Sequence, residues 1–498
     1  MSKKWHWLAA FVFLMALVLR VYHLGSQGLF LDEAWSWDAA RLPLGDLFKL
    51  PLHDPHPVFY YLLLKISLWV LPATEAGLRA LSAFFSLAAI VVLGAAAVRW
   101  WGWDAVFPVV LLAAMSPFDV YYAQEARMYT LLSAVVVLSA CLLVFALDDH
   151  AEWLFPWGLS AALLPWIHAY GLLYLGAEIS LLVLVGLTRY RKGALPALFL
   201  RRAVVGSIAA ILGALPMMIL FWTYRQGNAG GAWVPSWSDL WRFGGLLSVG
   251  FPAVRDYFLD GAHLIPPVLS SLSWVVWTII GLAWFFVPPL IGYFSYKRDD
   301  EGNETVSLAL LWIAVLPVLM AFGYARVLQN RMWAFKSLLG SAMLLYLFLS
   351  AGIIRVPRLF RVLWLGGCVL LSLNALWPYY HTWQKTVMPA AIEQINPSSE
   401  WALVLKPPYA APVAYFYAGE NIPLWGLTGK GKLVDVPSPF VSAFYAPPDG
   451  ISCHTPAMQR VQEIWLLGAE PQTVLASYPC LEKVDLWWYS GGQWIKSP

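Results

Sequence analysis

The chain carries a series of apolar runs, each about as long as the stretch of helix that crosses a bilayer. With 60% hydrophobic and only 12% charged residues, a soluble protein of 498 residues could not keep so much apolar surface from water. After a first run that ends at Leu24, further runs lie near 78–98, 104–117, 128–147, 153–168, 171–187, 203–223, 269–293, 306–323, 333–353 and 360–377. We therefore expect a polytopic α-helical membrane protein with about eleven spans.

Charges in the loops predict the orientation of these spans. Lys3 and Lys4 precede the first run, which reaches Leu24 without a small-residue cleavage site, so we expect an uncleaved helix with a cytoplasmic N-terminus. Except for Asp148-Asp149-His150, whose acids carry little weight in this rule, the loops then predicted inside are basic: they contain Arg99, Arg189, Arg191, Lys192, Arg201, Arg202, Lys297, Arg298, Arg355, Arg358 and Arg361. An odd number of spans in the cytoplasmic membrane then places the residues after about Tyr379 outside.

A change in composition predicts two domains, an apolar one at 1–378 and a polar one at 379–498. Within the first, an outer loop at 25–77 includes an amphipathic segment at 57–71, read as a helix on the membrane or as an ordinary core helix. A second outer loop at 224–267 is rich in glycine, which favours a mobile lid. The polar part shows strand-like runs at 401–405, 461–467 and 484–489 and a helix-like one at 411–418, which predict a small α/β domain.

The four cysteines divide between these two parts. Cys141 and Cys368 lie in apolar runs and are expected to be packing residues. Cys453 and Cys480 lie in the polar part and can form a disulfide if that part is outside the cell. The net charge of +3 and the lack of a long basic run argue against nucleic acid as a partner.

Two adjacent carboxylates, Asp32 and Glu33, follow the first apolar run among aromatic residues. In a purely structural reading, Asp32 caps a helix from Glu33 to Leu42, and Glu33 lies in its first turn. In a functional reading, one carboxylate is a general base that takes a proton from a sugar-accepting hydroxyl at a partly desolvated site. Other polar groups expected on the same side of the membrane favour the functional reading.

A turn bounded by prolines, His53-Asp54-Pro55-His56-Pro57, precedes the amphipathic segment. Imidazole and carboxylate are common metal ligands, so the turn could hold a metal. Two histidines in such a turn are weak evidence, and a structural turn or a phosphate contact by His53 and His56 is favoured. The use of a divalent metal stays open, and no other cofactor is expected.

The segment from Met115 to Tyr129 contains a further set of polar residues. Pro117 is expected to end a helix, and Tyr121, Glu125 and Tyr129 then recur at i, i+4 and i+8, on one face of the next helix. Arg127 would lie on another face. Glu125 and Arg127 could be ordinary surface charges, but such groups near a bilayer tend to face a cavity.

Two arginines near the end of a later span, Arg326 and Arg331, offer planar guanidinium groups suited to phosphate oxygens. Each taken singly could equally be a residue that extends its charge to the membrane interface.

Three segments also resemble a known group of enzymes: Leu31-Asp-Glu-Ala-Trp35, His56-Pro-Val-Phe-Tyr-Tyr-Leu-Leu-Leu-Lys65 and Ser116-Pro-Phe-Asp-Val-Tyr-Tyr-Ala-Gln-Glu-Ala-Arg-Met-Tyr-Thr-Leu131. There the chain resembles polyprenyl-phosphate-dependent glycosyltransferases of the GT-C superfamily, in the branch similar to bacterial protein O-mannosyltransferases and lipid A aminoarabinose transferases. The segments cover the first third of the chain. The span count and the soluble C-terminal part fit the superfamily more loosely.

The resemblance implies inverting transfer of a sugar from a polyprenyl-phosphate donor to a protein, lipid or glycan acceptor at the outer face of the membrane. Asp32 would be the base or would position the acceptor, with Glu33 beside it. His56 falls where aminoarabinose transferases have a lysine near the donor phosphate. Glu125, Arg127 and Tyr129 would line the cavity, and we add Tyr60, Tyr121 and Tyr122 as substrate contacts. A transporter or flippase of a lipid-linked sugar, and a non-catalytic membrane scaffold, are the alternatives.

Overall fold

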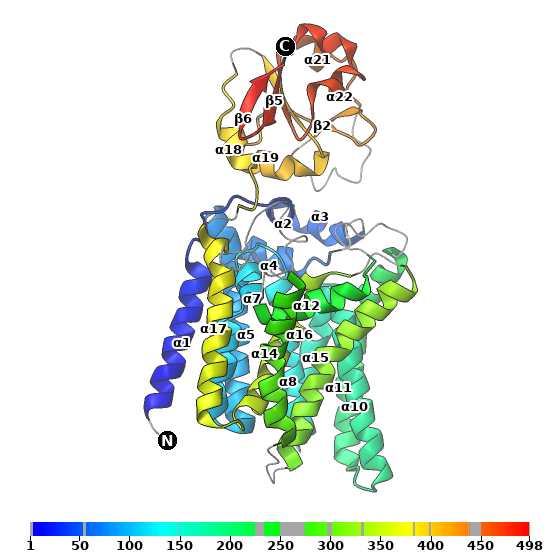
Figure 1. Cartoon of the computed structure of the whole chain (residues 1–498). Helices are drawn as coiled ribbons and strands as arrows, with labels where there is room; N and C mark the ends of the chain where they lie inside the picture. The colour runs from blue at the N-terminus through cyan, green and yellow to red at the C-terminus, as the bar shows by residue number, and fades with distance from the viewer. Residues whose placement is uncertain are drawn as a thin grey trace. The chain divides into compact units, whose positions relative to one another are not determined.

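The computed structural model of the protein describes residues 3–52, 56–148, 150–224, 234–249, 274–295, 301–329, 333–381, 384–397, 400–436, 438 and 450–497. It is mostly helical and contains one mixed sheet formed by C-terminal residues (Figure 1). Two compact units can be separated. We call Met1–Leu24, Asp54–Tyr60 and Arg79–Trp383 the helical unit, and Gly25–His53, Tyr61–Leu78 and Gln384–Pro498 the sheet unit.

Helices make up the helical unit, and most of the long ones run roughly parallel to one another (Figure 1). They are α1 (Lys3–Val21), α5 (Glu75–Trp101), α6 (Trp103–Met115), α7 (Pro117–Ala123), α8 (Tyr129–Leu147), α9 (Leu154–Ile167), α10 (Gly171–Arg191), α11 (Ala197–Tyr224), α12 (Trp237–Val249), α14 (Trp274–Ser295), α15 (Glu301–Val327), α16 (Leu339–Ile353) and α17 (Arg358–His381). Short 3-10 turns, η2 (Ala151–Trp153) and η5 (Phe335–Leu338), precede α9 and α16. The first residues of α5 belong to the sheet unit.

Seven helices among the described residues are long and apolar enough to cross a membrane, and the pair α6 and α7 makes up to eight. They cover 75–101, 129–147, 171–191, 197–222, 304–327, 335–353 and 358–381. Apolar parts of α1 and α14, Trp7–Val21 and Ile279–Phe294, are shorter. The expectation of a polytopic helical membrane protein is confirmed, while the count of about eleven spans stays a prediction.

Burial identifies α16 as the centre of the helical unit. All its residues are buried, and it packs against α6, α8, α14 and α15. A helix that is apolar all round can face either lipid or other helices, and the burial of α16 shows that it is enclosed by other helices. Small residues let the backbones approach closely: a Cβ on Gly352 of α16 would lie 2.2 Å from the carbonyl oxygen of Pro289 in α14. Other helices, such as α11, present many exposed apolar side chains and are expected to face lipid.

The chain bends by 58° between α6 and α7. Pro117 begins α7, and the hydroxyl of Ser116 accepts a hydrogen bond from the Asp119 amide at 3.3 Å, as expected of an N-cap. The guanidinium of Arg20 in α1 donates to the carbonyls of Ala113 and Ala114, at 2.9 and 2.8 Å, at the end of α6. The bend is therefore stabilised at both helix ends that meet there.

The predicted lid and the amphipathic segment each contain a helix among their described residues. The segment 224–267 contains α12, and its residues 225–233 and 250–267 lie outside the described residues. The segment 57–71 forms α4 (Phe59–Ser67), in which Tyr61 and Leu64 are fully buried. That burial agrees with the reading of an ordinary core helix.

The sheet unit contains the expected C-terminal strands and helix. Its strands are β1 (Trp401–Leu405), β2 (Leu424–Leu427), β3 (Leu433–Asp435), β4 (Glu463–Leu467), β5 (Asp485–Ser490) and β6 (Gln493–Lys496), in the order β3-β2-β1-β4-β5-β6. The four central strands are parallel and both edge strands antiparallel. β1 and the helix α19 (Ala411–Ala418) match the predicted bounds, and β4 and β5 begin one or two residues later than predicted.

Further short elements complete the sheet unit. They are α2 (Leu31–Arg41), α3 (Leu44–Lys49), η1 (Leu50–Leu52), α18 (Met388–Glu393), η6 (Pro408–Ala410), α21 (Pro456–Arg460), α22 (Pro471–Leu475) and η7 (Pro479–Lys483). The helix α2 comes from the segment 25–77, which was predicted to be an outer loop, and packs against α19, from the C-terminal part of the chain. The sequence predicts that residues 379–498 form a separate domain. This boundary at 378/379 stays a prediction.

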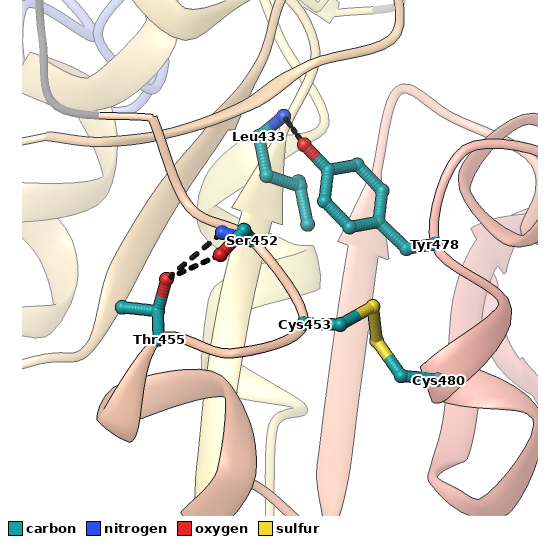
Figure 2. Close-up of a disulfide and its surroundings, with 6 residues drawn as sticks. All are labelled: Leu433, Ser452, Cys453, Thr455, Tyr478 and Cys480. Carbon is teal, nitrogen blue, oxygen red and sulfur yellow. Dashed lines mark hydrogen bonds between the residues drawn. A yellow bond between two sulfur atoms is a disulfide. The ribbon is translucent and has the colours of Figure 1, made fainter.

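A disulfide joins Cys453 to Cys480, as the sequence allowed, with a Cα–Cα distance of 5.9 Å (Figure 2). Beside it, the hydroxyl of Tyr478 accepts a hydrogen bond from the Leu433 amide at 2.7 Å (Figure 2). The disulfide ties the segment before α21 to the segment before β5. Cys141 and Cys368 are buried and unpaired, as expected of packing residues, in α8 and α17.

Candidate functional site

The acidic pair lies in the first turn of α2, not at its N-cap. Phe30 is the N-cap, so the expectation that Asp32 caps a helix beginning at Glu33 was wrong by two positions. The carboxylate of Glu33 accepts a hydrogen bond from the Phe30 amide at 3.0 Å. An acid at this third position satisfies an amide that the helix leaves unpaired, which explains why the helix begins earlier.

The two carboxylates have different surroundings. Glu33 is fully buried, and its Oε2 lies 3.3 Å from Nζ of Lys385, whose side chain is only 1% exposed. Asp32 is half-buried, and its carbonyl oxygen accepts a hydrogen bond from the Ser36 hydroxyl at 3.1 Å. Of the two carboxylates, only Asp32 has accessible surface. The Glu33 carboxylate instead accepts from the N-cap amide of α2 and pairs with the buried Lys385 ammonium.

In the helical unit, the segment Met115–Tyr129 differs from the single helix face that its spacing predicts. α7 ends at Ala123, residues 124–128 form a turn, and α8 begins at Tyr129, so Tyr121 and Tyr129 lie in different helices. The side chain of Gln124 explains the turn. Its amide donates to the carbonyls of Leu19, Arg20 and Tyr22 at the end of α1, at 3.2, 3.1 and 2.8 Å.

This turn places Arg127 in a cluster of basic side chains, which we call the basic cluster: His56, Arg127, His168 and Lys336. Arg127 is 2% exposed, and its Nη2 lies 3.0 Å from Nε2 of His56. The rings of His56 and His168 are 6.2 Å apart. Nζ of Lys336 lies 5.0 Å from the ring centre of Tyr129, and that ring is 5.9 Å from the His168 ring.

His168 is held in its neutral form. Its Nδ1 accepts a hydrogen bond from the Tyr170 amide at 3.1 Å, so the proton lies on Nε2, which is 3.3 Å from the Ser337 hydroxyl. Burial first, and then electrostatic interactions with His56, Lys336 and Arg127, hold the pKa of His168 well below its usual value. An anion placed among these groups would raise the pKa of His168 again.

The basic cluster gathers residues from four separate segments at one end of the helical unit. These are the turn before α4, the α7–α8 turn, the α9–α10 turn and η5. Three of those turns lead into α8, α10 and α16, so the N-termini of these helices also converge here. A helix N-terminus carries partial positive charge and unpaired amides, which favour anions. The arrangement is suited to a phosphate group.

The structure places the predicted tyrosines as supports of this cluster. The hydroxyl of Tyr60 lies 3.0 Å from that of Ser82, which donates to the carbonyl oxygen of Arg127 at 3.1 Å. Tyr121 and Tyr122 are 7% and 1% exposed, and the ring of Tyr122 is 5.2 Å from that of Tyr129. These residues fix the backbone and rings around Arg127.

The other predicted site residues have mixed positions. Glu125 is buried, and its carbonyl oxygen accepts a hydrogen bond from the Arg127 amide at 2.7 Å. Arg326 is exposed at the end of α15. His53 and Arg331 lie outside the described residues. In the part of the chain that the structure describes, no group of three or more His, Cys, Asp or Glu side chains could hold a metal.

A small cavity beside the α6–α7 bend includes none of the predicted site residues. Apolar side chains line it, among them Leu112, Met115 and Phe285, together with Tyr346 and Cys368. We assign it no role in the site.

No protein-family model and no curated protein matches the chain. Among solved structures, ArnT from Cupriavidus metallidurans in the apo state is similar, with 15% identity, a TM-score of 0.44, and coverage of 85% of this chain and 86% of that one. The apo oligosaccharyltransferase of Archaeoglobus fulgidus has 12% identity, a TM-score of 0.46, and coverage of 86% and 65%. Arabinosyltransferase EmbB from Mycobacterium smegmatis has 12% identity, a TM-score of 0.33, and coverage of 77% and 42%.

All three are glycosyltransferases of the GT-C fold, the group that the sequence segments resemble. With identities of 15% or less and TM-scores below 0.5, these similarities assign no residue a role.

Two members of the basic cluster, His168 and Lys336, were missed by the sequence analysis. Each had a signal that could have found it. Lys336 is the one Lys or Arg within the apolar run 333–353, and His168 ends the run 153–168. Ionisable residues in or beside a membrane span are costly and usually functional, so isolated ones merit the attention that paired motifs receive.

Proposed function

We propose that this protein is a membrane glycosyltransferase that moves a sugar, with inversion, from a polyprenyl-phosphate donor to an acceptor at the outer face of the cytoplasmic membrane. The observation that carries the proposal is the basic cluster, which collects an arginine, a lysine and two histidines at the end of an apolar helix bundle.

Phosphate fits this cluster for energetic reasons. Positive side chains crowded into a poorly hydrated site repel one another and are stabilised by an anion. The guanidinium of Arg127 can donate two parallel hydrogen bonds to phosphate oxygens, and the ammonium of Lys336 adds a compact charge. When the sugar leaves, negative charge develops on the phosphate, and fixed cations stabilise that transition state more than the ground state.

Inverting displacement also requires a base opposite the leaving group. Asp32 is our choice, because it belongs to the motif that resembles the glycosyltransferases and because it is the more exposed of the two adjacent carboxylates. It lies in the first turn of α2, where the helix dipole stabilises an acidic side chain, and a carboxylate can accept a proton from the acceptor hydroxyl. Glu33 then has a supporting role.

Two further observations support a lipid-linked donor and an outer location. The sequence has no phosphate-cradling nucleotide motif, as expected if the donor is not a sugar nucleotide. The disulfide Cys453–Cys480 is of the kind that forms and persists outside the cytoplasm. The acceptor, whether protein, lipid or glycan, is identified by the products of the assay below.

The test uses the full-length protein in lipid nanodiscs with radiolabelled polyprenyl-phosphate sugars and membrane extract as the acceptor source. We expect Asp32→Asn to lower kcat by about 100-fold or more, with an unchanged melting temperature. We expect Arg127→Gln to raise the KM for the donor by about tenfold as well as to lower kcat, because it removes a charged phosphate contact.

Asp46→Asn is the matched control, because Asp46 is an exposed acid of α3 in the same unit, where it pairs with Lys49 at the surface. It should leave both constants unchanged. Transfer by Asp32→Asn at the wild-type rate would reject the base, and a wild-type protein that does not bind polyprenyl phosphate would reject the donor class.

One observation favours the alternative of a transporter for a lipid-linked sugar. Glu178 is fully buried within the span α10, where the Trp157 indole donates to it at 2.9 Å and the Ser139 hydroxyl also donates. Acids buried inside spans are rare, and in transporters they mark ion and substrate pathways. Movement of labelled lipid across vesicles, without modification of any acceptor, would favour transport over transfer.

A further inference from the structure

The N-terminal end of α2 is contacted by two residues from the C-terminal part of the chain, Lys385 and Tyr417. Lys385 contacts it twice: the ammonium pairs with the Glu33 carboxylate at 3.3 Å, and the backbone amide donates to Oε1 of Gln27 at 3.1 Å. Both side chains of the ion pair are almost fully buried, at 1% and 0% exposure. Removal of Lys385 would take a buried cation away from the Glu33 carboxylate, one residue from Asp32.

Tyr417 of α19 makes a second connection to the same end. Its hydroxyl accepts a hydrogen bond from the Leu29 amide at 2.7 Å and donates to Oε1 of Glu75 at 2.9 Å. One hydroxyl thereby joins the segment before α2 to the start of α5. Tyr417 thus holds the backbone just before Phe30, the N-cap of α2, and Lys385 holds the Glu33 carboxylate that accepts from the Phe30 amide.

The other end of α2 is fixed independently. Arg41 forms an ion pair with Glu420, and the Trp37 ring contacts the Phe416 ring edge-on at 5.1 Å. The ammonium of Lys65 donates to the carbonyls of Ala40 and Leu42, at 3.0 and 2.9 Å, where the helix ends. A helix held here by an ion pair, a ring contact and a cap does not need Lys385 to remain folded.

We propose that Lys385 is a positioning residue that, with Tyr417, holds the carboxylate of Asp32 in its reactive place. The inference rests on the proposed function for the role of Asp32. It assigns the C-terminal residues a part in catalysis: they set the geometry of the base without touching the substrate. A base must lie within hydrogen-bond reach of the proton it takes, and a misplacement of about 1 Å can cost about 100-fold in rate.

The central experiment compares Lys385→Met with the double variant Glu33→Gln/Lys385→Met in the nanodisc transfer assay. We expect Lys385→Met to lower kcat by about tenfold or more and to change the donor KM by less than about twofold, because Asp32 moves while the phosphate site stays intact. The double variant should recover most of that loss. Its neutral side-chain amide at position 33 can still accept from the Phe30 amide, and the buried ion pair is removed as a whole.

Lys496→Met is the matched control. Lys496 forms an ion pair of 2.6 Å with Asp485 in the same unit, but both side chains are about half exposed and lie on β5 and β6. Its removal should change neither kinetic constant. Hydrogen exchange of the full-length protein provides a readout independent of activity: Lys385→Met should speed exchange of amides 29–36, and Lys496→Met should not.

The outcomes separate the two claims. Unchanged exchange at 29–36 and unchanged kcat in Lys385→Met would overturn the positioning role. Loss of activity in the double variant as deep as in Lys385→Met would overturn it too, because Glu33 itself would then be required. If wild-type protein transfers no sugar but Lys385→Met speeds exchange at 29–36 alone, the proposed function fails while the structural link stands.

Discussion

At the scale of single residues, the chain assigns neighbouring groups of one type to different tasks by burial. Asp32 and Glu33 are adjacent, yet Glu33 is buried against Lys385 while Asp32 keeps exposed surface. His56 and His168 contact each other, and His168 is the one whose hydrogen bonds select the neutral form. In each pair, one residue supports the structure around the other.

The neutral state of His168 predicts how donor binding responds to pH. Its pKa is lowered below the ordinary value of about 6.5 by burial and by neighbouring cations, so the free protein leaves it unprotonated near pH 7. A bound phosphodiester adds negative charge and raises that pKa, so the complex takes up a proton. Affinity for the donor should therefore rise as pH falls through the pKa of His168 in the complex and level off below its lowered pKa in the free protein.

Binding of a polyprenyl-phosphate sugar measured at several pH values checks this prediction. His168→Gln keeps the size and polarity of the side chain and should flatten the pH dependence. The same slope in wild type and variant would assign the effect to another group.

Stability has the opposite trend, because the unfolded chain protonates His168 first: stability contributed by the neutral form falls as pH drops below about 6.5.

At the scale of elements, the break between α6 and α7 depends on one buried ion pair. Arg20 of α1 lies 2.6 Å from Asp119 of α7, and both side chains are fully buried. The same guanidinium donates to Ser86 of α5 at 2.8 Å, and Ser86 also donates to Asp119. Three helices thus meet at a polar network inside an apolar bundle, which orients the α7–α8 turn that carries Arg127.

This network predicts an asymmetric response to mutation. Arg20→Met leaves Asp119 buried without its cation and should lower the free energy of unfolding by about 3–5 kcal/mol. The double variant Arg20→Met/Asp119→Leu should lose less, because no charge remains in the apolar interior. The stability of the single and the double variant is measured from their melting temperatures in detergent and from the amount of folded protein in membranes. A single variant as stable as wild type would show that the pair contributes no stability.

At the scale of the whole molecule, local patterns predicted the elements, and long-range contacts decided the site. Apolar length was enough to predict the helices, and alternating strand-like runs predicted β1, β4 and β5 to within two residues. Helical spacing failed from Tyr121 to Tyr129, since the bonds of Gln124 to the carbonyls of α1 outweigh local helix propensity. The partners Lys385 and Lys336 could not be predicted, because no motif records contacts between segments so far apart in the chain.

The sheet unit is assembled from three separate segments of the chain, and the disulfide cross-links the last of them, which contains all the strands. Cys453 and Cys480 are 27 residues apart, so cross-linking them reduces the entropy of the unfolded chain by an amount equivalent to about 3–4 kcal/mol. Reduction should therefore lower the melting temperature of the full-length protein and speed hydrogen exchange in β4 and β5. The double variant Cys453→Ala/Cys480→Ala should show the same loss and no further response to reductant. Cys141→Ala, which removes a buried unpaired thiol, should respond to reductant as wild type does. A wild-type protein whose melting temperature is insensitive to reductant would show that packing of the strands alone holds the unit together.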